Sequence, residues 1–337
     1  MRRNAWTAGL LAVLTGWSAG SAMAQQPLRD ITFGTNWLAQ AEHGGYYQAL
    51  ADGTYEKYGL KVTIVPGGPR ANNRMLMSVG KLDFYMGGSL IQAFSAVEKN
   101  IPTVVVAAHF QKDPQILMSH PGQGLDSFTD LKKSNDILLS KDGTATFFQW
   151  MKAEFGFKDE QVKPYGFNPA PFIANSRAVQ QGYVTSDPLV IGKAAGFAPN
   201  VFLLADHGFS TYSTTIETRR DVVEKDANLV QRFVDASTLG WYTYLYGDNA
   251  KGNALIKRDN PEMTDEILTY AVTKLKEHGI VDSGDAQKHG IGAMSDARMK
   301  DFFDKMVKAG LFKADLDYTK AYTLQFVNKG VGLELKK

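Results

Sequence analysis

The sequence of 337 residues contains no cysteine. Disulfide bonds, thiolate metal sites, cysteine nucleophiles and iron–sulfur clusters are therefore excluded. A lipid anchor of the bacterial lipoprotein type is excluded as well, because it requires a cysteine just after the signal peptide. The fold must rest on its hydrophobic core rather than on covalent cross-links.

The chain also lacks an excess of charge of either sign. It has 37 Lys and Arg residues against 35 Asp and Glu residues, which gives a formal net charge of +2. Residues of both signs are mixed along the sequence, so there is no basic patch of the kind that binds nucleic acid or an anionic membrane. We expect no nucleic-acid partner.

Long hydrophobic runs are missing after the first residues. Met1–Arg3 is basic, a mostly apolar segment covers 6–17, and Ala22–Ala24 has the small-residue spacing of a cleavage site. The apolar segment is too short for a mature membrane-spanning helix, and the order of the three parts is typical of a secretory signal peptide. We therefore predict a signal peptide at 1–24 and a soluble periplasmic protein.

Several catalytic patterns are missing too. The sequence has no His-Glu-x-x-His pattern and no Gly-rich ATP-binding motif, and its 6 histidines do not follow the spacing of metal ligands. We expect no cofactor, no bound metal and no catalytic residue. A cluster of His43, His109 and His207 brought together by the fold remains an open alternative.

Strand and helix patterns alternate along the first two thirds of the chain, which indicates βαβ units and an α/β fold. The predicted strands are 31–35, 61–65, 83–86, 103–108, 137–140, 162–167, 182–185, 200–205 and 213–218. The predicted helices are 44–58, 71–79, 91–98, 128–133, 143–155, one starting at Pro188, and then 221–246, 250–257, 264–278, 295–309 and 318–328. The segment 114–118 is interpreted as a crossover.

The most informative segment is 36–69, which follows the first strand. It contains Trp37, a His43-Gly44-Gly45 turn, an aromatic-rich helix and a second strand. This order resembles the opening of periplasmic solute-binding proteins of ABC importers, in the branch that includes binders of sulfonates, taurine, nitrate and thiamine pyrimidine precursors. The resemblance covers nearly the whole chain after the signal peptide.

The resemblance implies a type II periplasmic-binding-protein fold, in which two crossover segments join two α/β lobes. Lobe one is then discontinuous, with residues 25–112 and 216–337, and lobe two covers 113–215. Ligands of such sheets bind beyond the carboxyl ends of the strands, in the crevice between the lobes. Lobes of this kind close on the ligand by a hinge motion.

The first loop of the expected crevice carries Trp37 and His43, and the helix after it brings Tyr47 to the same side. Together they could stack on, and form hydrogen bonds with, a flat heteroaromatic ring. The alternative for Tyr47 is simple packing of the helix on the sheet.

The next loops of lobe one carry Gly88, Ser89 and Phe110. A glycine at a strand end lets a ligand approach the backbone. Ser89 is a candidate ligand contact, although capping of the following helix would explain it equally well. Phe110 lies where a strand leads toward the hinge.

Lobe two contributes Thr144, Tyr183 and Asp187. Thr144 stands at a helix start, where free backbone N–H groups bind anions or carbonyls. Many members of the resembled family carry an acidic residue before the proline that follows Asp187. An acid there favours an amino or amidine group on the ligand, and the alternative is an N-cap for the helix.

These residues predict the solute-binding component of an ABC transporter, which captures a small, planar, pyrimidine-like or aromatic ligand. Apart from Arg70 and Arg74, the rim segments of lobe one carry no Lys or Arg, whereas an anion would need charge-matched donors. Sulfonate, taurine or nitrate is therefore only the alternative ligand class. We expect a monomer that delivers its ligand to an ABC permease and ATPase.

Two alternatives of another class remain open: a periplasmic ligand sensor, and an enzyme similar to the fungal pyrimidine synthase of this fold. That enzyme depends on a Cys-rich loop, whereas the corresponding segment 208–212 has no cysteine. The Asn-rich lead-in to the family histidine is also altered here, to Gln40 and Glu42.

Overall fold

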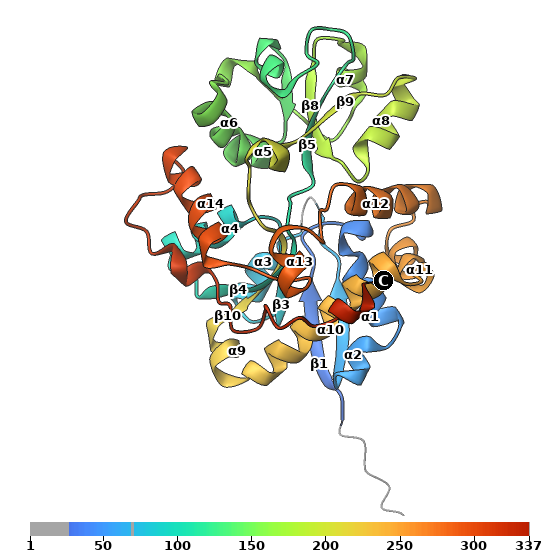
Figure 1. Cartoon of the computed structure of the whole chain (residues 1–337), viewed down its shortest axis with the longest axis vertical. Helices are drawn as coiled ribbons and strands as arrows, with labels where there is room; N and C mark the ends of the chain where they lie inside the picture. The colour runs from blue at the N-terminus through green and yellow to red at the C-terminus, as the bar shows by residue number, and fades with distance from the viewer. Residues whose placement is uncertain (1–26, 69–70, 337) are drawn as a thin grey trace, which may run out of the picture.

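The computed structural model describes residues 27–68 and 71–336, so the predicted signal peptide at 1–24 lies outside the described residues. The chain forms two lobes stacked along the longest axis (Figure 1). Each lobe is built on one five-stranded sheet. The predicted α/β architecture with two lobes is confirmed.

The sheet of lobe one has the order β2-β1-β3-β10-β4. β1 pairs in parallel with β2 and β3, whereas β10 is antiparallel to both of its neighbours. Its strands are β1 (Arg29–Gly34), β2 (Leu60–Val65), β3 (Phe84–Gly87), β4 (Thr103–Phe110) and β10 (Ser213–Arg219).

The helices of lobe one come from both ends of the described chain (Figure 1). The first group is α1 (Gly44–Ala51), α2 (Thr54–Lys57), α3 (Asn73–Ser78) and α4 (Leu90–Glu98). The second group is α9 (Arg220–Lys225), α10 (Ala227–Tyr246), α11 (Ala250–Asp259), α12 (Asp265–Glu277), α13 (Gly284–His289) and α14 (Asp296–Lys308).

The sheet of lobe two has the order β7-β6-β8-β5-β9, with β5 antiparallel to β8 and β9. Its strands are β5 (Gln115–Ser119), β6 (Ile137–Leu139), β7 (Val162–Pro164), β8 (Val179–Tyr183) and β9 (Asn200–Leu203). Its helices are α5 (Lys141–Ala145), α6 (Phe147–Phe155), α7 (Ala170–Ala174) and α8 (Asp187–Ala195). The 3-10 turns of the chain are η1 (Ala41–His43), η2 (Phe128–Lys133), η3 (Asp159–Gln161), η4 (Leu204–His207), η5 (Tyr318–Ala321) and η6 (Leu333–Leu335).

Three predicted helices are each broken in two. The helix at 44–58 ends at Gly53, whose left-handed φ of 74° interrupts it between α1 and α2. The helix at 143–155 breaks at Thr146 (φ −117°, ψ −100°), between α5 and α6. The helix at 221–246 breaks at Asp226, whose carboxylate accepts a hydrogen bond from the Leu229 N–H and caps α10.

Other elements differ from the predictions in kind. The segment predicted as a crossover at 114–118 forms β5, and helices α7 and α13 were not predicted. The predicted helix at 318–328 is wrong, because only the short turn η5 forms. The following residues run along β4, where the Thr323 N–H donates to the Val105 carbonyl at 3.0 Å.

This last difference explains how strand β4 is buried along its full length although it lies at the edge of its sheet. On its outer side, Val105 bridges to Tyr322 and Ala108 bridges to Gly292. An uncovered strand edge exposes unpaired backbone groups and invites pairing with another chain. The C-terminal residues therefore protect this edge.

The packing of lobe one depends on a close crossing of α1 and α10. A Cβ added to Gly240 would lie 2.1 Å from the Gly45 carbonyl oxygen, and a Cβ added to Gly45 would lie 2.2 Å from the Trp241 ring. The glycines of the His-Gly-Gly turn are thus required for packing of helix on helix. Among residues 27–68 and 71–336, no helix is both long and apolar enough to cross a lipid bilayer.

The crossing gives a stability prediction. Gly240→Ala should lower the free energy of unfolding by about 2 kcal/mol or more, because the backbone of α1 cannot move away without disturbing the core. Chemical denaturation measures this change. Gly166→Ala is the matched control, since a Cβ there meets nothing within 4 Å. Equal stability of the two variants would contradict the packing argument.

Candidate ligand-binding cleft

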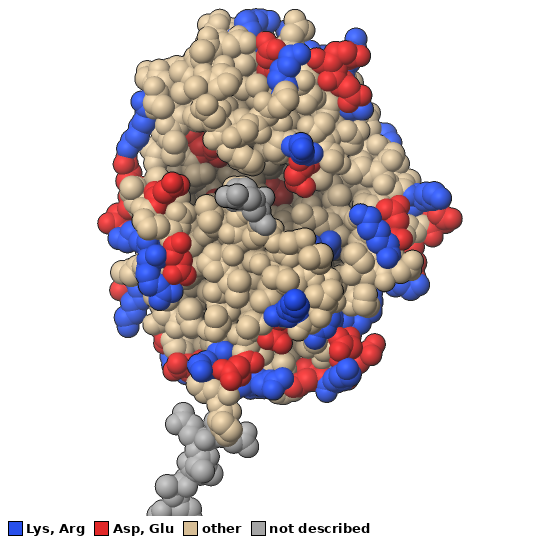
Figure 2. All heavy atoms as spheres, turned by 180° about the vertical axis from the view of Figure 1, so that it is seen from behind, with Lys and Arg blue, Asp and Glu red and all other residues tan. Residues whose placement is uncertain are grey.

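A hollow separates the two lobes on the face shown in Figure 2, and acidic atoms are visible in its walls. The loops that follow β1 and β3 reach this region from lobe one. The starts of α5 and α8 reach it from lobe two. Because these loops lie at the carboxyl ends of parallel strands, the hollow is where a ligand is expected in an α/β sheet protein.

An aromatic contact spans the cleft. The ring of Trp37, in lobe one, lies 5.5 Å from the ring of Phe167, in lobe two, at an interplanar angle of 41°. The Trp37 carbonyl accepts hydrogen bonds from the Thr35 hydroxyl at 2.8 Å and the Gly67 N–H at 3.0 Å, which fix the loop. Phe167 is 57% exposed and also contacts Tyr165 of its own lobe, with the two rings 5.3 Å apart.

A polar contact joins the lobes deeper inside. The Thr185 hydroxyl of lobe two donates a hydrogen bond to the Glu42 carboxylate of lobe one. Both side chains are buried. Burial raises the pKa of Glu42 above its ordinary value, and the nearby Asp187 carboxylate raises it further.

Four carboxyl groups act on the pKa of the Tyr183 phenol. Burial raises its pKa well above the usual range, and Asp113, Glu42, Asp142 and Asp187 raise it further, in that order. One carboxyl comes from lobe one, one from the connection between β4 and β5, and two from lobe two. The cleft is therefore acidic on both sides.

Each of the other three carboxyls is held by its own local structure. Asp187 starts α8 and accepts a hydrogen bond from the Tyr183 N–H at 2.7 Å. Asp113 accepts one from the Gln115 N–H at 2.9 Å. Asp142 is in the first turn of α5 and stays exposed.

Burial raises the pKa of Asp187 and Asp113, that of Asp113 to about 7. Within the described part of the chain, no lysine or arginine contributes to the pKa shifts of Asp113, Asp142, Asp187 or Glu42.

Arg74, a basic residue of the predicted rim, is already paired. Its Nε and one terminal nitrogen donate to the Glu217 carboxylate at 3.1 and 3.0 Å, and that same terminal nitrogen donates to the Gln92 carbonyl at 2.7 Å. Glu217 is buried on the sheet of lobe one. Arg74 thus forms a structural ion pair with Glu217. Arg70 lies outside the described residues.

Two of the predicted contact residues lie in the interior of lobe one. Tyr47 is fully buried, and its hydroxyl donates to the Asp259 carboxylate at 3.0 Å. Phe110 is also fully buried and packs edge-on against Trp241 at 5.3 Å. We therefore do not include either residue in the cleft.

His43 is also fully buried, but neither of its ring nitrogens has a hydrogen-bond partner among the described residues. Burial lowers the pKa of His43 to about 3, so the ring is neutral. The turn η1 places it directly beside Glu42.

Gly88, Ser89 and Thr144 are partly exposed. Ser89 occupies the N-cap position of α4, but its side chain makes no capping hydrogen bond, so capping does not explain it. The Thr144 hydroxyl donates to the Ser140 carbonyl within α5 at 2.9 Å. Trp37, Tyr183 and Asp187 are the predicted residues with contacts or charges that face the opposite lobe.

Sequence reasoning did not select Glu42, Asp113, Asp142, Phe167 or Thr185 as site residues. Glu42 stands next to the family histidine, and this neighbourhood was a signal that could have suggested it. Asp142 and Thr185 stand two residues from the predicted contacts Thr144 and Tyr183, and Phe167 ends a predicted strand, whereas no local pattern marks Asp113.

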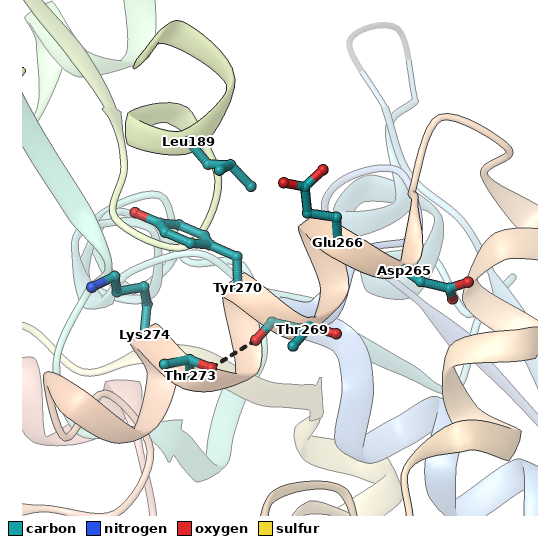
Figure 3. Close-up of a pocket in the computed structure, with 7 residues that line it drawn as sticks. All are labelled: Leu189, Asp265, Glu266, Thr269, Tyr270, Thr273 and Lys274. Carbon is teal, nitrogen blue, oxygen red and sulfur yellow. Dashed lines mark hydrogen bonds between the residues drawn. The ribbon is translucent and has the colours of Figure 1, made fainter. Parts of the chain in front are cut away.

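A second opening lies at the edge of the junction between the lobes (Figure 3). It has a volume of about 500 Å³ and is lined by Leu189 of α8 and by residues of α12, among them Glu266 and Tyr270. Lys193 of α8 forms an ion pair with Glu266 across this edge. Similarly, Lys308 of α14 lies 2.9 Å from Glu154 of α6. These exposed pairs join the outer surfaces of the lobes.

Histidine clustering was an open alternative. His109 accepts or donates a hydrogen bond with the Tyr46 hydroxyl at 2.9 Å, and His207 stacks on Phe128 of lobe two at 4.1 Å. In the described ranges, no three histidine or acidic side chains are grouped so as to hold a metal ion.

Two α/β lobes with a cleft between them, connected by two crossings of the chain, define the class of the type II periplasmic-binding-protein fold. The chain belongs to the family described as NMT1/THI5 like, whose family model matches residues 40–248. Both the predicted fold and the predicted family resemblance are confirmed.

The relatives are mainly binding proteins. The riboflavin-binding protein RibY of Chloroflexus aurantiacus is 23% identical over 323 residues, which cover 93% of this chain and 90% of RibY. The periplasmic aliphatic sulphonate binding protein SsuA of Escherichia coli has the same fold (TM-score 0.64, 13% identity, 87% of this chain and 91% of SsuA). The desulfurization enzyme DSZB also has it (TM-score 0.57, 12% identity, 88% and 97% covered).

Asp113 provides a test of the electrostatics by pH. Its folded pKa of about 7 lies above the ordinary value of 3.8, so the folded state holds a proton that the unfolded chain releases, and stability falls as pH rises from about 4 to 7. Asp113→Asn removes this dependence. We expect the variant to gain stability at pH 8, up to roughly 4 kcal/mol, and little at pH 4.

Thermal and urea unfolding at both pH values measure this effect. Asp315→Asn, at an exposed position, is the control. A stability difference for Asp113→Asn that is the same at pH 4 and pH 8 would contradict the assigned burial.

Phe167 provides a test of the contact across the cleft. Phe167→Ala should enlarge the average separation of the lobes, because the contact with Trp37 is lost, and it should hardly lower stability, because the side chain is 57% exposed. Small-angle X-ray scattering would show a larger radius of gyration. Val201→Ala, at another exposed apolar position of lobe two, should leave the radius unchanged. An unchanged radius in Phe167→Ala would remove this contact from the closing interactions.

Proposed function

We propose that this protein is the periplasmic solute-binding component of an ABC importer, which captures a small ligand by closing its two lobes. The observation that carries this proposal is the pair of contacts across the cleft, Trp37 with Phe167 and Glu42 with Thr185. Both contacts exist only when the lobes approach each other. A ligand enclosed between them would lose most of its contact with water, as is usual for small-molecule sites.

The ligand is proposed to be planar and partly apolar. Trp37 belongs to lobe one and Tyr183 to lobe two, and an aromatic ring bound between the indole and the phenol would gain stacking contacts. Asp187 would accept a hydrogen bond from an amino or amidine group. The NMT1/THI5-like family and the riboflavin-binding relative are consistent with a heterocyclic ligand. Ser89 and Gly88 would line the lobe-one side.

The partners follow from this role. A predicted signal peptide at 1–24 would deliver the protein to the periplasm as a soluble monomer. The closed form would dock on a permease, and an ATPase subunit would supply the energy, since this chain has no ATP-binding motif.

An enzyme on the same scaffold is the second candidate, because the desulfurization enzyme DSZB has the same fold. Incubation of the protein with the recovered ligand separates the two roles. Reversible binding of an unchanged ligand supports the carrier, whereas turnover supports the enzyme. Mass spectrometry of the small molecules released from gently purified protein identifies the ligand to be used.

Trp37 is the residue on which the site assignment depends. Trp37→Ala should weaken binding of the recovered ligand by at least about 1 kcal/mol, because the stacking surface is lost. Trp37→Phe, which keeps a ring, should lose less. Isothermal titration calorimetry measures both values, and circular dichroism checks that the fold is intact. An affinity that does not change in Trp37→Ala would refute the site.

A further inference from the structure

The two crossings of the chain between the lobes leave lobe one side by side. Strand β4 ends at Phe110, strand β10 begins at Ser213, and these two residues pair with each other in the sheet of lobe one. The first crossing therefore starts next to the point where the second one returns. Because closure of the lobes requires both crossings to bend, the contacts that hold them to lobe one decide where they bend.

One arginine of helix α14 joins the two crossings. The Arg298 Nε donates a hydrogen bond to the Ser210 carbonyl of the second crossing at 3.1 Å. One terminal nitrogen donates to the Gln111 carbonyl of the first crossing, and the other lies 3.3 Å from the Gln111 side-chain oxygen. The guanidinium lies over the Tyr212 ring, 4.2 Å from its centre. Since a guanidinium presents several donors in a rigid fork, one side chain can hold two backbone segments at once.

The C-terminal part of lobe one holds each crossing at a second point as well. On the first crossing, the Ile280 carbonyl accepts hydrogen bonds from the N–H groups of Gln111 at 2.7 Å and Lys112 at 3.1 Å. On the second, the Tyr212 hydroxyl accepts one from the Ser295 N–H at 3.0 Å. These attachments come from residues beyond the range 40–248 that the family model matches.

A few residues further along, the backbone of each crossing is bound to lobe two. The Pro114 carbonyl accepts a hydrogen bond from the Val184 N–H at 3.0 Å, and the Phe209 N–H donates to the Leu204 carbonyl at 3.1 Å. The Phe209 ring contacts aromatic side chains of both lobes. The chain therefore passes from one lobe to the other over two short segments, 112–114 and 209–210.

We infer that Arg298 is a positioning residue for closure of the lobes: it binds the two crossings into one unit on the side of lobe one, so that the lobes turn about 112–114 and 209–210. This inference rests on the proposed function and adds to it the residue that directs the closing motion. Without the guanidinium the two crossings can move independently, and lobe two can then take up a wider range of orientations.

Two spin labels measure this range of orientations. The chain has no cysteine, so Lys57→Cys in lobe one and Glu160→Cys in lobe two, both at exposed positions, can be labelled selectively. Pulsed electron paramagnetic resonance then gives the distribution of distances between the lobes in the protein without added ligand. Arg298→Met keeps a long side chain against the Tyr212 ring, and should broaden this distribution. An unchanged distribution would overturn the inference.

A milder variant covers the case in which Arg298→Met does not fold. Arg298→Lys keeps the positive charge, but its single ammonium group cannot replace the fork that reaches both crossings, so it should also broaden the distribution. Lys300→Met is the matched control, because Lys300 is exposed on the same helix and pairs with Asp304. Equal distributions in Arg298→Lys and Lys300→Met would refute the role of the guanidinium.

Hydrogen exchange distinguishes a positioning role from a general loss of stability. In Arg298→Lys, exchange at the Gln111 and Lys112 amides should become at least about threefold faster, while the amides of β6 in lobe two should keep their rates. A similar acceleration throughout both lobes would show that Arg298 only stabilises the fold. The outcome is separate from that of the proposed function: turnover of a recovered ligand would overturn the carrier role and leave the role of Arg298 intact.

Discussion

Helix α1 can lie against α10 only because Gly45 and Gly240 have no side chains. The turn η1 ends where α1 begins, so this crossing also fixes the position of Glu42 at the wall of the cleft. In the sequence, Gly45 of the His-Gly-Gly turn looks like part of a ligand-binding loop. In the structure it serves the packing of α1 on α10. Gly45 and Gly240 allow α1 to lie close to α10, and this position of α1 determines where η1 and Glu42 stand relative to lobe two.

The two contacts across the cleft differ in physical character. Trp37 and Phe167 form an apolar contact in which Phe167 is mostly exposed, so it can form and break at little cost. Glu42 and Thr185 form a buried polar contact beside other carboxyls, and its strength depends on charge. The lobes can therefore approach each other easily through the contact between Trp37 and Phe167. Complete closure also requires the polar contact between Glu42 and Thr185, and it depends on what is bound between the lobes.

The alternation of strands and helices was enough to predict the α/β class and most strand positions, because buried strands and amphipathic helices leave periodic patterns. It failed at 318–328, where the segment covers the edge of β4, since that role depends on a strand some two hundred residues earlier. Asp187 and Trp37 could be selected from a family pattern. Asp113 and Thr185 could not, because their role arises only when the chain folds and brings distant segments together.

The order of strands limits how much of lobe one can fold while the chain is being synthesised. Strand β10 lies between β3 and β4, which means that these neighbours in the sequence cannot be joined until the whole of lobe two has been synthesised. The residues that pair with the outer edge of β4, Gly292 and Tyr322, are synthesised later still. Long-range pairings of this kind delay folding. The sheet of lobe one therefore stays incomplete until almost the whole chain has been synthesised.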